Sequence, residues 1–219
     1  MEEPLLEIRG LAKRFGKRSG RELAPWIIQD LTFSVSEGEF LTVIGPSGAG
    51  KTTLLNIIAQ IDVASGGEVR FQSQSAPIDD LKALQPGLAC RIGYVTQDDH
   101  LLPWRTTLQN VLFPLTVQGR LNAETRTRAE MLIRTVGLGG FENHYPHELS
   151  GGMRKRAALI RTLVYNPPVI LMDDHSARST RKPGPSCKRI CCGCGISGRK
   201  PSSSSLTISP KQSRSATAR

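Results

Sequence analysis

Hydrophobic and polar residues follow one another along this chain with two different periods, which separate strands from helices. Period-two alternation or a short continuous apolar run predicts strands over residues 5–9, 26–35, 40–44, 68–71, 92–95 and 169–172. Apolar residues three and four positions apart predict helices over residues 51–61, 107–117, 123–136 and 152–165. The run from Phe40 to Ile44 is typical of a buried parallel strand, so we expect an α/β fold.

The formal charge of +10 lies entirely in the last part of the chain. Residues 1–174 contain 19 Lys and Arg against 19 Asp and Glu, and they are enough to bury the core of one ordinary domain. A neutral folded part offers no basic face, so we expect no specific binding of nucleic acid. Cys90 is the only cysteine of this part, no signal peptide is visible, and no apolar run approaches the ~20 residues that span a bilayer. We therefore expect a cytosolic chain.

A glycine-rich segment directly follows the apolar run that ends at Ile44. It fits the pattern G-x-x-x-x-G-K-[ST] and consists of Gly45, Pro46, Ser47, Gly48, Ala49, Gly50, Lys51, Thr52 and Thr53. Glycines let backbone N–H groups turn inward around a phosphate, and the following helix N-terminus adds partial positive charge. Lys51 can reach the β- and γ-phosphates of ATP, and the Thr52 hydroxyl can bind Mg²⁺. The flanking strand and helix argue against the alternative, an accidental glycine-rich turn.

A second glycine-containing helix start lies about a hundred residues further along. Ser150, Gly151 and Gly152 precede a basic helix, and a helix N-terminus with bare backbone amides can bind a second phosphate. Alone, such a sequence is more often a helix-entry turn. Its position between the glycine-rich segment and an apolar strand that ends in Asp173 favours the phosphate site.

In this order, the motifs of residues 5–174 resemble the nucleotide-binding subunit of ATP-binding cassette (ABC) transporters. The resemblance implies a P-loop NTPase core with an antiparallel β flank from residues 5–36 and part of 68–96, and a helical subdomain at about 98–153. It implies ATP and Mg²⁺ as ligands and an integral-membrane permease as partner, at the cytoplasmic face of the cell membrane. It also implies a head-to-tail homodimer, in which Ser150, Gly151 and Gly152 of one copy close on the ATP held by the Lys51 loop of the other.

The same resemblance implies roles for four further residues. Gln97 fits the glutamine that contacts Mg²⁺ and senses the permease, and Asp173 fits the acid that holds Mg²⁺ through water. Phe15 fits the aromatic residue that stacks on adenine, and Asp174 stands where a glutamate polarises the attacking water. Three of them have an ordinary alternative: a strand-end glutamine for Gln97, a capping aspartate at a strand end for Asp173, and a core aromatic ring for Phe15.

Residues 99–106, Asp-His-Leu-Leu-Pro-Trp-Arg-Thr, followed by Asn110 and Val111, are similar to one importer branch of the family. That branch serves permeases for nitrate, sulfonate, taurine or bicarbonate, to which a periplasmic or lipid-anchored substrate-binding protein delivers the cargo. The cassette never touches the cargo, so the cargo stays open. The rival function is that of a soluble ABC protein acting on DNA or ribosomes. The short interval between Gln97 and Leu149, and the presence of one cassette, argue against it.

The family pattern breaks off at Asp174. A strand that ends in Asp173 should continue as E-P-F-G-A-L-D, whereas the chain continues as D-H-S-A-R-S-T. Loss of one base explains the change, since GAC-GAG-CCA-TTC-GGC-GCG-CTC-GAC without the last G of GAG encodes Asp173 to Thr180 as they stand. The restored frame contains the glutamate, the later aspartate and a strand that ends in histidine. The sequence therefore predicts a core without its C-terminal part and with impaired catalysis.

Residues 175–219 are expected to be a disordered basic tail outside the original reading frame. They contain ten Lys and Arg, no acid and eleven Ser, with few large apolar groups to offset the entropy of ordering. Their four cysteines lack the paired C-x-x-C spacing of a zinc site, and nonspecific contact with nucleic acid is the other alternative. A catalytically inactive remnant of an importer subunit is therefore a second function that stays open.

Overall fold

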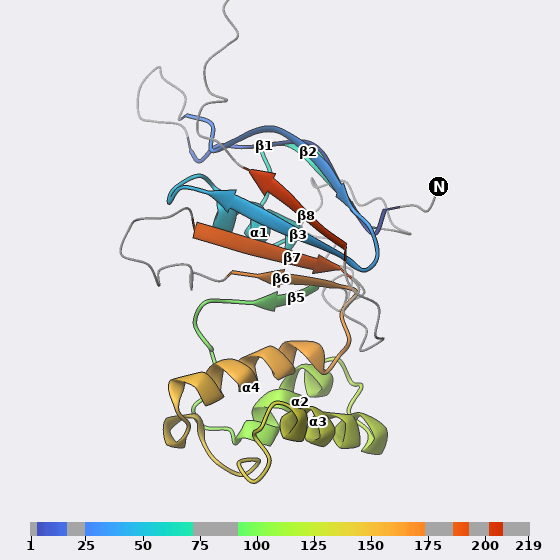
Figure 1. The fold of residues 1–219 in the computed structure, drawn as a ribbon, viewed down its shortest axis with the longest axis vertical. Coiled ribbons are helices and arrows are strands. Elements are labelled where there is room, and N and C mark those ends of the chain that lie inside the picture. The colour runs from blue at the N-terminus through green and yellow to red at the C-terminus, as the bar shows by residue number, and fades with distance from the viewer. Residues whose placement is uncertain (1–3, 17–24, 72–91, 174–185, 193–201, 208–219) are drawn as a thin grey trace, which may run out of the picture. The chain divides into compact units, whose positions relative to one another are not determined.

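Two compact units make up the structure, a computed structural model that describes residues 4–16, 25–71, 92–173, 186–192 and 202–207. One unit consists of Met1–Gln85 and Asp173–Arg219, and the other of Pro86–Met172. Figure 1 shows the order of the elements along the chain. Among the described helices, none combines the length and the hydrophobicity needed to cross a membrane.

The first unit contains an antiparallel sheet of three strands in the order β2-β1-β4. Their bounds are β1 Leu6–Lys13, β2 Ile28–Val35 and β4 Gly66–Phe71. The register of β1 shifts between Ile8 and Leu11, where Gly10 has a φ of +57°. This extra residue turns Leu11 to the buried side that Leu6 and Ile8 already occupy, so the same face stays buried although the spacing changes from two residues to three. The predicted antiparallel β flank is confirmed.

The same unit contains β3 (Glu39–Gly45), which has a neighbour on each side. β7 (Ser186–Cys192) pairs with it antiparallel, and β8 (Ser202–Thr207) pairs with it parallel. Both strands fall in the part of the chain that is expected to be a disordered tail, and the rest of residues 174–219 lies outside the described part. β3 presents backbone N–H and C=O groups on both sides, and backbone ladders form without an apolar pattern in the partner strand.

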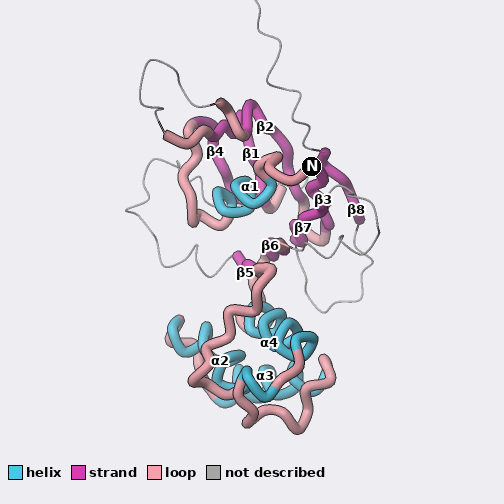
Figure 2. The backbone as a smooth tube through the Cα atoms, turned by 90° about the vertical axis from the view of Figure 1, so that its left-hand side faces the viewer, coloured by secondary structure: helices cyan, strands magenta, loops and turns pink. Residues whose placement is uncertain are grey.

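The second unit combines two parallel strands with three helices, which Figure 2 shows grouped together. Their bounds are β5 Ile92–Val95, α2 Thr107–Val117, α3 Ala123–Thr135, α4 Gly151–Leu163 and β6 Val169–Met172, with a short 3-10 helix over Pro146–Glu148. Thr106 and Asn122 begin α2 and α3, each in a reciprocal capping box with the residue three positions later. These caps explain why the predicted helix starts match the observed ones.

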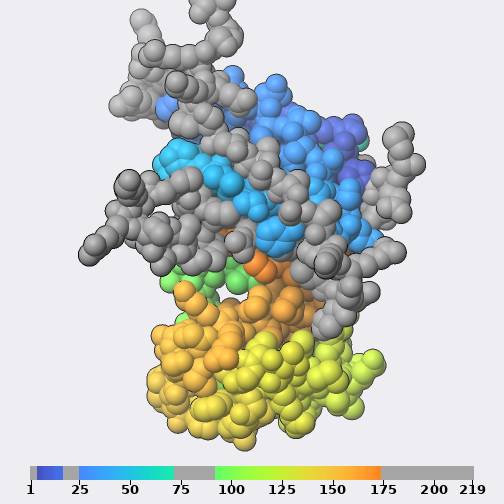
Figure 3. Space-filling model, viewed as in Figure 1, coloured from blue at the N-terminus to red at the C-terminus, as the bar shows by residue number. Residues whose placement is uncertain are grey.

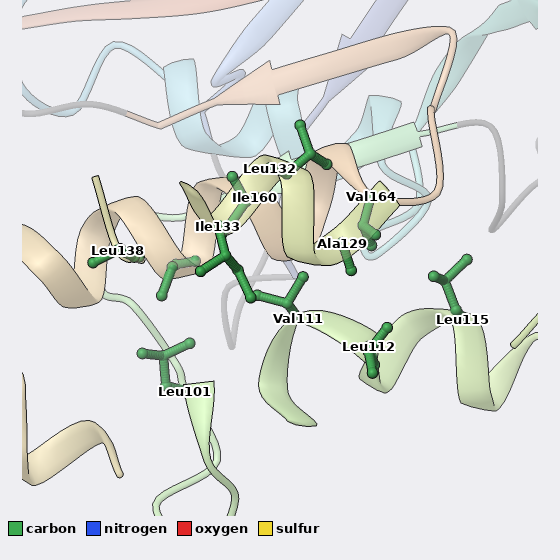
Figure 4. Close-up of a cluster of buried hydrophobic side chains, with 12 residues drawn as sticks. Leu101, Val111, Leu112, Leu115, Ala129, Leu132, Ile133, Leu138, Ile160 and Val164 are labelled. Carbon is green, nitrogen blue, oxygen red and sulfur yellow. The ribbon is translucent and has the colours of Figure 1, made fainter. Parts of the chain in front are cut away.

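Apolar side chains from α2, α3 and α4 form the core of the second unit, as Figure 4 shows. Val111, Ile133 and Ile160 represent the three helices in it, and each is fully buried. The sequence predicts that the helical subdomain ends at about residue 153. α4 extends ten residues beyond that point, because its apolar face belongs to this cluster. In Figure 3, side chains from α3 and from the chain around α4 cover the visible face of this unit in yellow and orange.

Candidate functional site

A tight glycine-rich loop joins the end of β3 to α1 (Lys51–Ile58). Gly48 and Gly50 have φ angles of +81° and +82°, which residues with a side chain rarely adopt. A Cβ on Gly48 would meet nothing within 4 Å, whereas one on Gly50 would lie 2.7 Å from Cγ2 of Ile27. Gly50 is thus also required by close packing, and Gly48 leaves one side of the loop open.

The side chain of Lys51 is buried against this loop. Its Nζ donates hydrogen bonds to the carbonyl oxygen of Gly45, at 2.8 Å, and to that of Pro46. Only 4% of the residue is exposed. A lysine buried to this extent needs hydrogen-bond partners, and these two carbonyl oxygens provide them. The loop therefore holds an ammonium group at the point where the strand ends and the helix begins.

The N-terminus of α1 differs from those of the other helices. α2, α3 and α4 each begin with a side chain that accepts a bond from a backbone N–H group. In α1, all of whose residues are described, Gly50 provides no side-chain cap and the first turn contains no acid. The positive end of its dipole is therefore not balanced by a carboxylate in its first turn, and such a helix end favours an anion.

Ser150 begins α4, and its Oγ accepts a hydrogen bond from the N–H of Met153 at 3.3 Å. Gly151 and Gly152 are exposed in the first turn, with no positive φ. A Cβ on Gly152 would meet nothing within 4 Å, and one on Gly151 would lie 3.8 Å from Nη2 of Arg154. Glycine costs about 1 kcal/mol relative to alanine inside a helix, and the described part of the chain gives no local reason for it here. Because these glycines have no side chains, the backbone at the start of α4 stays accessible.

Gln97 is exposed, two residues after the end of β5. Two arginines of α4, Arg154 and Arg161, form hydrogen bonds with the segment that follows Gln97. Nε of Arg154 donates to the Asp99 carboxylate at 3.0 Å, and Arg161 donates to the backbone carbonyls of His100, at 2.7 Å, and Asp99, at 3.0 Å. Burial lowers the pKa of Arg161, partly offset by the charge of Asp99, and the guanidinium stays protonated at neutral pH. These contacts leave no local pattern in the sequence, because the residues that make them lie 55 to 62 positions apart.

The structure divides the candidate site residues between the two units. Phe15, the residues from Gly45 to Thr53 and Asp173 belong to one unit, and Gln97 with Ser150, Gly151 and Gly152 belongs to the other. Asp173 follows β6 and is 8% exposed, whereas Thr52 is exposed in the first turn of α1. Carboxylate and hydroxyl oxygens of this kind are ligands that Mg²⁺ prefers. Asp174 lies outside the described residues.

The strand, glycine-rich loop, buried lysine and uncapped helix together define a P-loop nucleotide-binding protein. The family model described as "ABC transporter" matches residues 28–177. This chain therefore belongs to the ABC transporter family, as an ATP-binding subunit.

Relatives and solved structures of the same family are similar to the chain over most of its length. The uncharacterized ABC transporter ATP-binding protein MJ1508 of Methanocaldococcus jannaschii is 34% identical, over 89% of this chain and 85% of that protein. MJ0412 of the same organism is 43% identical over 77% of this chain, which spans 59% of that longer protein. A dimeric post-hydrolysis structure of the ATP-binding cassette MJ0796, bound to ADP and Pi, is 34% identical with a TM-score of 0.65, over 77% of this chain and 73% of that one.

Proposed function

We propose that this chain binds MgATP at the loop from Gly45 to Thr53 and energises transport through a membrane permease. The observation that carries the proposal is the loop itself, with its two left-handed glycines, its buried Lys51 ammonium and the uncapped start of α1. These groups concentrate positive charge and backbone N–H donors at one point, as a polyphosphate requires. Family membership and the nucleotide-bound relative support ATP as the ligand.

Each candidate residue has a distinct part in the proposed chemistry. The loop backbone holds the phosphates, Lys51 neutralises charge on the β- and γ-phosphates, and Phe15 stacks on the adenine. Thr52 and Asp173 would hold Mg²⁺, which supplies positive charge to the phosphate oxygens when bound. Hydrolysis is the in-line attack of water on the γ-phosphate, for which Asp174 takes the position of the polarising base and Gln97 that of a sensor.

The active form that we propose is a head-to-tail homodimer. Gly151 and Gly152 have no local requirement for glycine in the described part of the chain, so we infer that another surface approaches the start of α4 closely. The ATP held by the Lys51 loop of a second copy provides such a surface, with phosphate charge to match the helix N-terminus. The relative MJ0796 is dimeric in its ADP-bound structure, which supports this arrangement.

Complementation between two variants tests the composite site. In the Lys51→Ala variant the phosphate loop is damaged, and in the Ser150→Arg variant the start of α4 is damaged. Each variant alone has a defect in both sites of a head-to-tail dimer, whereas a mixed dimer has one intact site. We expect MgATP to dimerise an equimolar mixture, but neither variant alone, in analytical ultracentrifugation. Failure of the mixture to dimerise, where the wild type does, contradicts the head-to-tail site.

For the transported substrate we propose a small anion such as nitrate, a sulfonate, taurine or bicarbonate. The support is the sequence of the segment Asp99–Thr106, which is similar to the importer branch that serves these anions. This chain would lie at the cytoplasmic face of the membrane, and its partners would be an integral-membrane permease and, through it, a substrate-binding protein. Uptake of each labelled anion by cells without the gene, and by the same cells that carry the gene with one base inserted at codon 174, tests this assignment. Uptake that does not depend on the frame-restored gene contradicts it.

A second proposed function is that of an inactive remnant of such a subunit. Residues 175–219 hold the entire net charge, no acid and four of the five cysteines, as expected after the loss of one base in codon 174. The family match ends at residue 177, three positions beyond that codon, which supports the proposal. Sequencing of the DNA around codon 174 in independent isolates tests it. An intact reading frame would mean that the base loss is accidental, and it would contradict the inactive remnant.

A further inference from the structure

Lys13 is a buried lysine that the proposed function leaves without a role. It ends β1 and is 7% exposed, and its Nζ donates to the Asp62 carboxylate at 2.6 Å and to the carbonyl oxygen of Val63. Burying an ammonium group is costly unless it is paired and hydrogen-bonded, as it is here. The arrangement therefore fixes the end of β1 to the segment that contains Asp62.

The partner of Lys13 is itself anchored to the helix of the phosphate loop. The backbone N–H groups of Ile61 and Asp62 both donate to the carbonyl oxygen of Asn56, at 2.8 and 3.2 Å. Asn56 belongs to α1, which begins at Lys51. The Lys13–Asp62 ion pair thus connects the end of β1 to the last turn of the helix that follows the phosphate loop.

A second link joins the same point to the other end of α1. The N–H of Ile27 donates to the carbonyl oxygen of Lys13 at 2.8 Å. The side chain of Ile27 packs against Gly50, where a Cβ would lie only 2.7 Å from its Cγ2. Lys13 is therefore tied to the helix that follows the phosphate loop at both of its ends.

The ammonium of Lys13 also lies over the ring of Phe15, 4.6 Å from its centroid. Phe15 is 51% exposed, so its ring is not a core residue of the described unit. A cation over one face of an aromatic ring attracts its π electrons and restricts how the ring can turn. The contact therefore favours one placement of the Phe15 ring relative to the phosphate loop, with one face of the ring against Lys13.

We propose that Lys13 is a positioning residue that sets the Phe15 ring for stacking on the purine base of a nucleotide, at a defined distance from the phosphate loop. This inference rests on the proposed function. It goes further than the proposed function, because it assigns a role to the Lys13–Asp62 pair. The pair connects Phe15, which would contact the base, to the loop that would hold the phosphates. Its consequence is that Lys13 contributes to the binding of ATP but not to the binding of a triphosphate that lacks a base.

The test compares MgATP with magnesium tripolyphosphate on the full chain, each by competition with a fluorescent ATP analogue. We expect Lys13→Met to weaken ATP binding about three- to tenfold and to leave tripolyphosphate binding unchanged. Arg9→Met is the matched control, since Arg9 is another cation of β1, paired with Glu7 on the exposed side, and we expect no change in either affinity. Equal weakening of both ligands by Lys13→Met, or no weakening of either, overturns the inference.

Two further variants keep the result decisive. In a Phe15→Leu background, Lys13→Met should cause no additional loss of ATP affinity, because the two residues act as a unit. Asp62→Asn keeps the ammonium and weakens its anchor, so it should reduce ATP affinity in the same direction if Lys13→Met does not fold. Lys51→Ala should weaken both ligands. If the wild-type chain binds neither ligand, the proposed function fails, independently of Lys13.

Discussion

Asn110 is a single side chain that holds the backbone of the segment from Leu102 to Thr106. It is fully buried, and its Oδ1 accepts a bond from the N–H of Leu102 at 2.7 Å. Its Nδ2 donates to the carbonyl oxygens of Leu102, Arg105 and Thr106 at distances of 3.1, 2.9 and 3.1 Å. One amide group thus satisfies backbone groups that would otherwise lose their partners. Asn110 therefore holds the irregular backbone from Leu102 to Thr106, whereas Arg154 and Arg161 hold Asp99 and His100.

Replacing Asn110 with Ala should lower the free energy of unfolding by about 2–3 kcal/mol, because backbone groups would be left buried without partners. The matched control is Gln109→Ala, which removes an exposed capping interaction with the N–H of Thr106 and should cost about 1 kcal/mol or less. Urea denaturation of the wild type and both variants measures the two losses. Equal losses would mean that the Asn110 network contributes no more than an exposed cap.

Among the elements, those with a strong local signal could be predicted from the sequence. The apolar runs at residues 92–95 and 169–172 and the capped helix at 107–117 have the bounds that the patterns predict. Contacts between distant residues could not be predicted, because neither the Asp99–Arg154 bond nor the Lys13–Asp62 pair leaves a local pattern. β7 and β8 were missed for another reason: they are held by backbone pairing with β3, whereas periodicity reports only side chains.

A substitution at the start of α4 should change the free energy of unfolding and the tendency to dimerise in opposite directions. Gly152→Ala should raise the free energy of unfolding by about 0.5–1 kcal/mol, because alanine favours the helix and its Cβ meets nothing within 4 Å. The same variant should weaken MgATP-dependent dimerisation, because the added methyl group occupies space that we assign to the second copy. Thermal unfolding and analytical ultracentrifugation measure the two effects. A variant that is more stable and dimerises as well as the wild type would remove the proposed role of Gly152.

At the scale of the whole molecule, the chain combines a family core with a tail of unrelated composition. β3 is paired on both sides by segments of that tail, antiparallel to β7 and parallel to β8. Backbone pairing places little demand on the identity of side chains, so it agrees with a tail that arose from a changed reading frame. Catalysis, in contrast, depends on particular groups. Asp174 is one methylene shorter than the glutamate expected there, and residues 175–219 contain no acid.

We therefore expect the full chain to bind ATP and to hydrolyse it negligibly. A one-base insertion that restores E-P-F-G-A-L-D after Asp173 should recover steady-state hydrolysis, because it returns the polarising glutamate and the later histidine. Phosphate release by the chain with and without the insertion is the measurement. Comparable turnover without the insertion, abolished by Asp174→Asn, would show that the tail causes no catalytic loss.

The central claim is that the loop from Gly45 to Thr53 binds a nucleotide through Lys51. Equilibrium binding of a fluorescent ATP analogue to the wild-type chain and to Lys51→Ala tests it most directly. The matched control is Arg126→Ala, which removes an exposed cation of α3 that is paired with Glu130. We predict saturable binding to the wild type and to Arg126→Ala, and binding weakened by at least about a hundredfold in Lys51→Ala, since the loss removes a buried charge from the phosphates. Equal affinity of all three proteins would contradict the claim.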